Sequence, residues 1–144
     1  MKSNDDDVFE KFQYWLVEMD SALESFFKFL PTEMRTELDY TPASVDTLER
    51  WLLRKYETID SLKLDTEKVI WDGASRYIGE TFRKCLGGKW HIDKPNKKIM
   101  FSGLPQLVEM RGQVGPVCPL TLVSAALDRR VGNFISSLIR RHLS

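Results

Sequence analysis

The sequence predicts a single helix-rich α+β domain with a small antiparallel sheet at about residues 89–110. Long stretches repeat their apolar residues at steps of three and four, which is the period of a helix with one buried face. One of these stretches ends at Gly87-Gly88, and the residues directly after it alternate between polar and apolar, as in a half-buried strand. A chain of 144 residues is also the size of one domain with one hydrophobic core.

A long helix is predicted near the N-terminus. Pro31 ends this helix or opens a short one after it, because the residue that precedes a proline is restricted to extended backbone. Its apolar residues, at helical spacing, are Val8, Phe9, Phe12, Trp15, Leu16, Met19, Leu23, Phe26, Phe27 and Leu30. We therefore expect residues 1–38 to form a helical segment that packs on an α+β core of residues 39–144, all within one domain, 1–144.

A second helix is predicted from Ser44, which serves as its N-cap. Its buried face comprises Val45, Leu48, Trp51, Leu52 and Tyr56. Residues 57–64 are expected to connect it to a central helix that is capped by Asp65 or Thr66. The buried stripe of this central helix comprises Val69, Ile70, Ala74, Tyr77, Ile78, Phe82 and Cys85.

Two glycines lie inside the central helix. Gly73 and Gly79 each cost about 1 kcal/mol of helix stability relative to alanine. A helix retains such residues where a neighbouring element crosses close to its backbone. We therefore expect a close approach at both positions.

Two short strands, residues 89–93 and 98–102, are predicted on either side of a turn at residues 94–97, whose Pro-Asn sequence favours a turn. A third strand is expected around residues 107–110, where apolar residues recur. These segments together would form the predicted antiparallel sheet.

A last helix is predicted from Cys118, with Pro119 at its first helical position. Its buried face comprises Leu120, Val123, Leu127, Val131, Phe134, Leu138 and Ile139. Asp128, Arg129 and Arg130 lie on its polar side. This cluster fits either an acidic partner or the acidic first helix of the same chain, and we expect the second.

The composition indicates a soluble cytoplasmic protein without membrane association. Hydrophobic residues make up 42% of the chain, enough for a packed core. No apolar run approaches the about 20 residues that span a bilayer, and the acidic N-terminal sequence differs from a secretion signal. Two cysteines are too few for a disulfide framework, which suits a reducing compartment.

The formal net charge of zero conceals an uneven distribution. Residues 1–65 carry 15 acidic and 8 basic side chains, whereas residues 66–144 carry 6 acidic and 13 basic ones. The two halves can neutralise each other by packing together, or one charged face can meet an oppositely charged partner. A pI near 6.7 disfavours dedicated nucleic-acid binding.

The chain carries no linear catalytic or metal-binding signature. Its two histidines, His91 and His142, lie in no nucleophile motif. Cys85 falls on an apolar helix face and is expected to pack in the core, whereas Cys118 at a helix start is a weak candidate for a reactive thiol. Two cysteines and two histidines without CxxC or HxxxH spacing disfavour a zinc site. We expect neither a metal nor a cofactor.

The best candidate binding surface combines one row of the central helix with the strand that follows. It comprises Arg76, Glu80, Arg83, Lys84, Trp90, His91 and Asp93. Helix residues four apart lie side by side, so this row alternates in charge. The strand would add an aromatic anchor, and Arg and Trp are enriched at interaction hot spots. The alternatives are a solvated, salt-bridged helix face and a Trp90 that belongs to the core.

Several short motifs between Asp39 and Arg141 carry a resemblance to known sequences. They are Ser44, Leu48, Glu49, Arg76-Tyr77-Ile78-Gly79-Glu80-Thr81-Phe82, Gly87-Gly88-Lys89-Trp90, Gly103-Leu104-Pro105 and Cys118-Pro119-Leu120-Thr121. On these motifs the chain resembles a family of small uncharacterised bacterial proteins, and it is loosely similar to immunity-type and accessory interaction proteins. The resemblance covers about two-thirds of the chain and implies an interaction role, with no residue roles to transfer.

Three functions are compatible with the sequence. The first is a cytoplasmic protein-interaction module, for example an immunity-type protein that neutralises a toxin. The second is an enzyme without a linear motif that uses Glu80, His91 and Asp93, although the absence of motifs favours a protein that is not an enzyme. The third is a nucleic-acid-associated protein that uses the basic C-terminal half. A homodimer through the apolar first helix also fits the pattern.

Overall fold

The computed structural model describes residues 4–112 and 114–143, and for Asn4 and Asp5 it describes the backbone alone. It confirms the α+β class, with a two-stranded antiparallel sheet beside the helices. The α-helices are α1 (Asn4–Val17), α2 (Met19–Phe27), α3 (Thr32–Arg35), α4 (Pro42–Lys55), α5 (Ile59–Leu62), α6 (Lys68–Leu86), α7 (Pro119–Arg129) and α8 (Phe134–Arg141), and the strands are β1 (Lys89–His91) and β2 (Gln106–Val108). Among the described helices, none combines the length and the apolar character that crossing a membrane requires.

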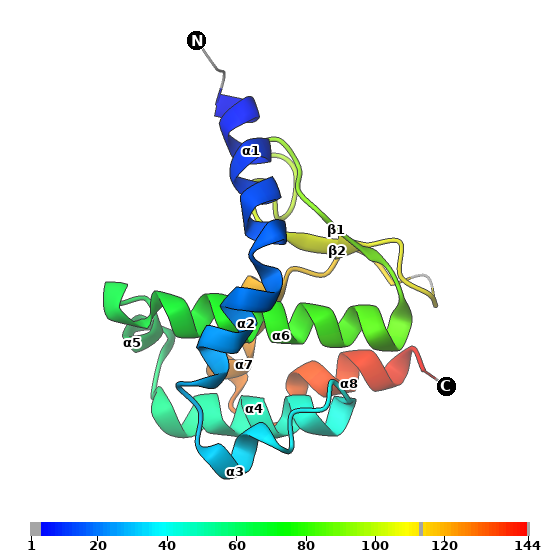
Figure 1. Ribbon diagram of the computed structural model, residues 1–144. Coiled ribbons are helices and arrows are strands. Elements are labelled where there is room, and N and C mark those ends of the chain that lie inside the picture. Colours follow the sequence, from blue (N-terminus) through cyan, green and yellow to red (C-terminus); the bar gives the residue numbers. More distant parts are fainter. Residues whose placement is uncertain (1–3, 113, 144) are drawn as a thin grey trace.

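Helix α6 is the centre of the fold. In Figure 1 it runs horizontally, with α4 and α8 below it and the sheet above its C-terminal half. Helix α2 packs across α6 at Gly73. A Cβ atom at this position would lie 2.3 Å from Phe26 Cγ, so the close approach predicted for Gly73 is confirmed.

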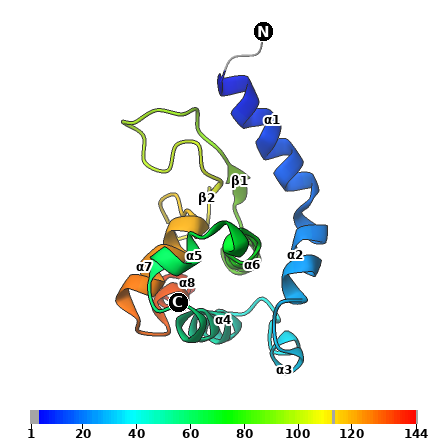
Figure 2. The same cartoon turned by 90° about the vertical axis from the view of Figure 1, so that its left-hand side faces the viewer.

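The first predicted helix is divided into α1 and α2 at Glu18. This residue has φ −85° and ψ 5°, which departs from helical geometry. Glu18 N still donates to Tyr14 O at 3.0 Å, and Ala22 N donates to Glu18 O at 2.8 Å, so the two helices remain joined end to end. Helix α2 packs on α6, whereas α1 extends beyond it on the side of the sheet (Figure 2).

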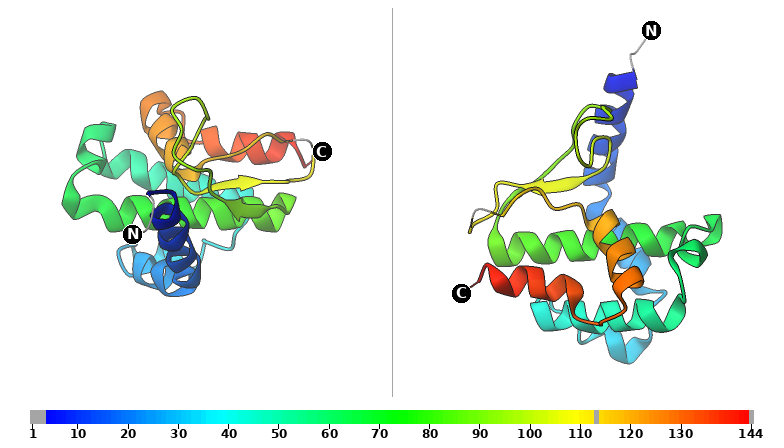
Figure 3. Two further views of the ribbon diagram at one scale, coloured as in Figure 1. Left: turned by 90° about the horizontal axis from the view of Figure 1, so that it is seen from above. Right: turned by 180° about the vertical axis from the view of Figure 1, so that it is seen from behind.

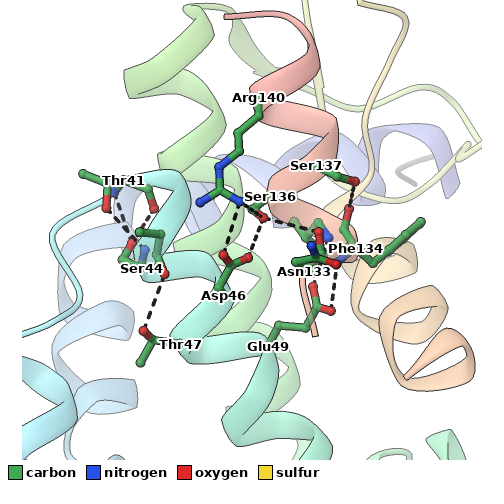
Figure 4. Close-up of polar contacts among 12 residues, drawn as sticks. Thr41, Ser44, Asp46, Thr47, Glu49, Asn133, Phe134, Ser136, Ser137 and Arg140 are labelled. Atoms are coloured by element: carbon green, nitrogen blue, oxygen red, sulfur yellow. Dashed lines mark hydrogen bonds and ion pairs between the residues drawn. The ribbon is translucent and has the colours of Figure 1, made fainter. Parts of the chain in front are cut away.

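Helix α4 begins three residues earlier than predicted. Its N-cap is Thr41, and Ser44 lies at the third helical position of a capping box. Ser44 N donates to Thr41 Oγ1 at 3.3 Å, and Thr41 N donates to Ser44 Oγ at 3.1 Å (Figure 4). Pro42 explains the difference, because proline fits the first helical position and sets the residue before it in extended backbone.

Helix α6 begins later than predicted. A 3₁₀ turn (Asp65–Glu67) precedes it, so neither Asp65 nor Thr66 is its N-cap. The predicted connection at residues 57–64 contains the short helix α5. Val69 was expected in the buried stripe but is 48% exposed, since it lies in the first turn of α6, where it faces solvent.

The strand partner of β1 is not the one predicted. β1 pairs with β2 in antiparallel register, with Trp90 opposite Leu107, so the expected third strand supplies the partner. The strand predicted at residues 98–102 is wrong, because Asn96 and Ser102 close this segment into a loop. Ser102 Oγ donates to Asn96 O at 2.8 Å and accepts from Asn96 N at 3.1 Å. Phe101 within it has φ 63°, which no strand residue adopts.

The last predicted helix is two helices. Helix α7 begins at Pro119 with Cys118 as its N-cap, as predicted. The chain then turns through Arg130 at φ 54° and Gly132 at φ 89° before α8 begins. Val131, expected to be buried, lies in this turn and is 63% exposed.

Arg130 contacts α4 rather than the acidic first helix, contrary to expectation. Its guanidinium donates to Leu53 O at 2.7 Å, Tyr56 O at 3.1 Å and Glu57 O at 2.8 Å. Leu53 O lies in the last turn of α4, and the other two carbonyl groups directly follow the helix, so the cation satisfies acceptors that the helix leaves open. The neighbouring Arg129 lies over the ring of Phe134.

A buried carboxylate of α4 caps α8. Glu49 is 1% exposed and accepts from Phe134 N at 3.0 Å and from Ile135 N at 2.9 Å (Figure 4). One turn earlier, Asp46 accepts a hydrogen bond from Ser136. These bonds fix the start of α8 against α4, because the first N–H groups of a helix need acceptors from outside it.

Candidate functional site

Helix α1, the start of α7 and the loop that follows β1 lie around α6 (Figure 3). An apolar groove lies between these elements. Its largest part has a volume of about 480 Å³ and adjoins a part of about 240 Å³ at Leu120. A third part, of about 180 Å³, continues from Trp15 between α1 and the loop. We call these three parts together the tryptophan groove, since Trp15, Trp71 and Trp90, three of the four tryptophans, line it.

Asp72 ties α1 to α6 beside the groove. Its Oδ1 accepts from Trp15 Nε1 at 2.8 Å, and its Oδ2 accepts from Arg76 Nε at 2.7 Å. Arg76 is 3% exposed, donates to Trp15 O at 2.7 Å and lies 4.2 Å from the Trp15 ring centroid. A buried cation with these partners holds the Trp15 ring in one orientation and neutralises the Asp72 carboxylate.

Trp90 forms one wall of the groove. Its ring packs directly on α6 at Gly79, which has no side chain. A Cβ atom at Gly79 would lie 2.1 Å from Trp90 Cη2, which confirms the close approach predicted there. The Trp90 ring meets Trp15 edge to face, with 4.8 Å between centroids. Its Nε1 donates to Glu80 at 3.4 Å.

The indole N–H groups of the groove all have partners within the protein. Trp71 Nε1 donates to Leu120 O at 3.1 Å, Trp15 donates to Asp72, and Trp90 donates to Glu80. The tryptophans therefore offer carbon surface to a ligand. The arrangement suits an apolar occupant that gains little from hydrogen bonds to the groove.

The residues that were predicted to form one binding surface on α6 and β1 lie in different environments. Arg76 is buried under α1, so it holds the fold together and is not accessible to a partner. Glu80 and Arg83 form an ion pair in which Arg83 Nη1 donates to both carboxylate oxygens, at 3.1 and 2.9 Å. Lys84 lies over the Tyr40 ring, 4.7 Å from its centroid. Trp90 packs against α6 and lines the groove. It is partly buried, so it is neither a core residue nor a fully exposed anchor.

His91 and Asp93 form a separate polar group. His91 Nε2 and Asp93 Oδ1 are 2.7 Å apart, and Asp93 Oδ2 accepts from Gln106 Nε2 at 3.1 Å. His91 follows Trp90 along β1, so the two side chains point to opposite faces of the sheet. The structure thus joins two of the three residues of the enzyme hypothesis, while Glu80 contacts Arg83 and Trp90 instead.

The two thiols offer no activated nucleophile. Both are free, and Cys118 is 1% exposed. Cys85 is half-buried and packs against the core. Burial raises the pKa of Cys85, and the nearby Arg111 opposes this effect. A raised pKa disfavours the reactive thiolate.

Sequence reasoning missed most of the groove. Trp15 and Trp71 belong to different helices, and Leu104 and Leu120 lie in segments that only the fold brings together. One usable signal was the i,i+4 spacing of Asp72 and Arg76, which predicts an ion pair on one helix face. The other was Trp71, a tryptophan of α6 that lies outside the predicted buried stripe of that helix.

Within the described ranges, no three His, Cys, Asp or Glu side chains gather in a way that could hold a metal ion. Comparison of the chain with protein-family models, curated proteins and solved structures finds no match. The resemblance to small bacterial proteins stays an expectation. The fold is a helix-rich α+β domain with an extended apolar groove.

Proposed function

We propose that this protein is a binding module for another protein, one segment of which occupies the tryptophan groove. The observation that carries the proposal is the groove itself, whose two larger parts measure about 480 and 240 Å³ and adjoin each other. Removing apolar surface from water contributes about 25 cal/mol per Å². Aromatic side chains in such pockets are the usual anchors of protein interfaces.

The polar groups of the groove support binding over catalysis. Asp72 is paired with Arg76, so it is no free base. Thr121 Oγ1 donates to Cys118 O at 2.9 Å, and Ser124 Oγ donates to Leu120 O at 3.5 Å, so neither hydroxyl is paired with an activating base. The enzyme hypothesis rests on the paired His91 and Asp93. The nucleic-acid hypothesis rests on the basic C-terminal half. Both stay predictions.

Two finer statements belong to this proposal. An immunity-type role would make the partner a toxin, and the loose sequence resemblance is its sole support. A cytoplasmic location is supported by the free thiols of Cys85 and Cys118, which suit a reducing compartment.

The test is affinity capture from the native cell extract at low and high salt, with a variant that fills the groove. Ser124→Phe adds a ring to the largest part of the groove. The matched control is Ser25→Phe, because Ser25 is exposed on α2 and lines none of the three parts. We expect one protein that wild type and Ser25→Phe retain and Ser124→Phe loses. Equal retention by all three, or retention of no protein by wild type, contradicts the proposal.

A further inference from the structure

The loop that borders the groove carries positive charge beside exposed apolar side chains. Lys94, Lys97 and Lys98 are exposed, and no ion pair forms at them within the described part of the chain. Ile99 is 43% exposed and Met100 is 75% exposed. We call residues 94–100 the lysine loop. Cations and large apolar side chains presented together mark a surface for a partner that is both acidic and apolar.

Hydrogen bonds within the loop fix its shape. Asn96 Oδ1 accepts from Lys98 N at 2.9 Å, and Asn96 O accepts from Ile99 N at 3.0 Å. At its base, Gly103 N donates to Asp93 O at 3.0 Å. Because these bonds order the loop, the loop loses less conformational entropy when a partner binds.

The charged side chains that line the groove also favour an anionic partner. Among the described residues, its lining contains Lys11 and Lys68 and a single carboxylate, Asp72, which Arg76 neutralises. Lys68 pairs with Asp65 at 3.3 Å, but both side chains are largely exposed, so this contact is weak. The unbalanced charge of the groove is therefore positive.

We infer that the partner segment is acidic and amphipathic, with apolar side chains that fill the tryptophan groove and carboxylates that contact the lysine loop. This inference rests on the proposed function and specifies the chemistry of the partner. A bilayer fits the observations less well, because a flat surface does not enter a concave groove. Nucleic acid also fits less well, because bases need free aromatic faces for stacking, whereas Arg76 covers Trp15 and Trp90 meets it edge-on.

The experiment uses random peptides of about 16 residues displayed on phage, a length that spans a docked helix. They are selected in parallel on wild type, on Lys97→Glu/Lys98→Glu and on Ser124→Phe. The matched charge control is Lys28→Glu/Lys63→Glu, because both lysines are exposed and line no part of the groove. Wild type and the charge control should enrich peptides that combine aromatic or aliphatic residues with net negative charge. Lys97→Glu/Lys98→Glu should bind them at least about tenfold more weakly, and high salt should reduce the difference.

The outcomes separate this inference from the proposed function. Enriched apolar peptides without acidic residues, bound equally by Lys97→Glu/Lys98→Glu, overturn the acidic partner and leave the groove intact. Peptides that Ser124→Phe binds as well as wild type show that the groove is not the site, which overturns both. Enrichment of no peptide, together with wild-type binding to phosphatidylserine vesicles or to a single-stranded oligonucleotide that Lys97→Glu/Lys98→Glu abolishes, overturns both in favour of that other ligand.

Discussion

Substituting alanine for Gly79 places a methyl group where the Trp90 ring now lies. The new Cβ would be 2.1 Å from Trp90 Cη2 and 2.3 Å from Cζ2, so the ring must move. Overpacking of this kind costs about 1–3 kcal/mol, and the better helix propensity of alanine offsets about 1 kcal/mol. We expect Gly79→Ala to destabilise the protein by up to about 2 kcal/mol and to displace one wall of the groove.

The sign of the effect should reverse when the ring is removed. In a Trp90→Ala background, Gly79→Ala meets no ring and should stabilise by up to about 1 kcal/mol. Urea unfolding of wild type, both single variants and the double variant gives the coupling free energy, which we expect to be about 1–3 kcal/mol.

Gly73→Ala is the matched control, since its Cβ would meet Phe26 at 2.3 Å rather than Trp90. It should destabilise the protein equally whether or not Trp90 is present. The reasoning is refuted if Gly79→Ala changes the free energy of unfolding by the same amount in both backgrounds.

Three further substitutions test the contacts that support the groove and the fold. Glu49→Gln removes the charge that caps α8 and leaves one of its N–H groups without an acceptor, so urea unfolding should show a loss of about 2–3 kcal/mol. The Tyr56 hydroxyl lowers the pKa of Glu67, so this carboxylate stabilises the fold above its ordinary pKa and loses that effect as the pH falls through its folded value. Tyr56→Phe should therefore lose less stability than wild type on acidification, as unfolding at several pH values would show. Asp72→Asn weakens the bonds to Trp15 and Arg76, so amide hydrogen exchange in α1 should accelerate more than in α2.

Each of these has a contradicting result. Stability of Glu49→Gln within about 0.5 kcal/mol of wild type would mean that the cap contributes little. Parallel acid-dependence curves for wild type and Tyr56→Phe would remove the proposed effect on Glu67. Unchanged exchange in α1 of Asp72→Asn would show that other contacts hold this helix.

The parts of the fold that follow from local chemistry were predictable. Gly73 and Gly79 predicted close approaches, because a glycine weakens a helix and is retained where a neighbouring side chain packs against the backbone. Gly87 has φ 76° at the end of α6, as expected of a residue that ends a helix. Pro119 likewise marked the start of α7. Glycine and proline affect the conformation of their own backbone, so their effect can be predicted from the local sequence.

Features that depend on distant residues were not predictable. Arg130 follows α7 and adopts a left-handed conformation. Its side chain is held by the carbonyl groups of Leu53, Tyr56 and Glu57, in and directly after the last turn of α4. Asn96 and Ser102 close a loop where alternating apolar residues predicted a strand. Arg76 looked like part of an exposed row, and its burial follows from the position of α1 above it.

The groove shows the same limit. Trp15, Trp71 and Trp90 are separated by up to 75 positions in the sequence, and no periodicity links them. The predicted surface included Trp90 as an aromatic anchor, because Trp is enriched at interaction hot spots. Its neighbours in the groove come from α1 and α7, whose positions the sequence alone did not fix.

The most direct test of the central claim is site-specific photocrosslinking in the native cell extract. A benzoylphenylalanine residue replaces Leu104 or the exposed Lys68, which line the groove, or Tyr14, which is 64% exposed on α1 and lines none of its parts. We expect the two groove positions to give an adduct with the same single protein and Tyr14 to give none. An adduct from Tyr14 alone, or equal adducts from all three positions, would contradict the groove as the binding site.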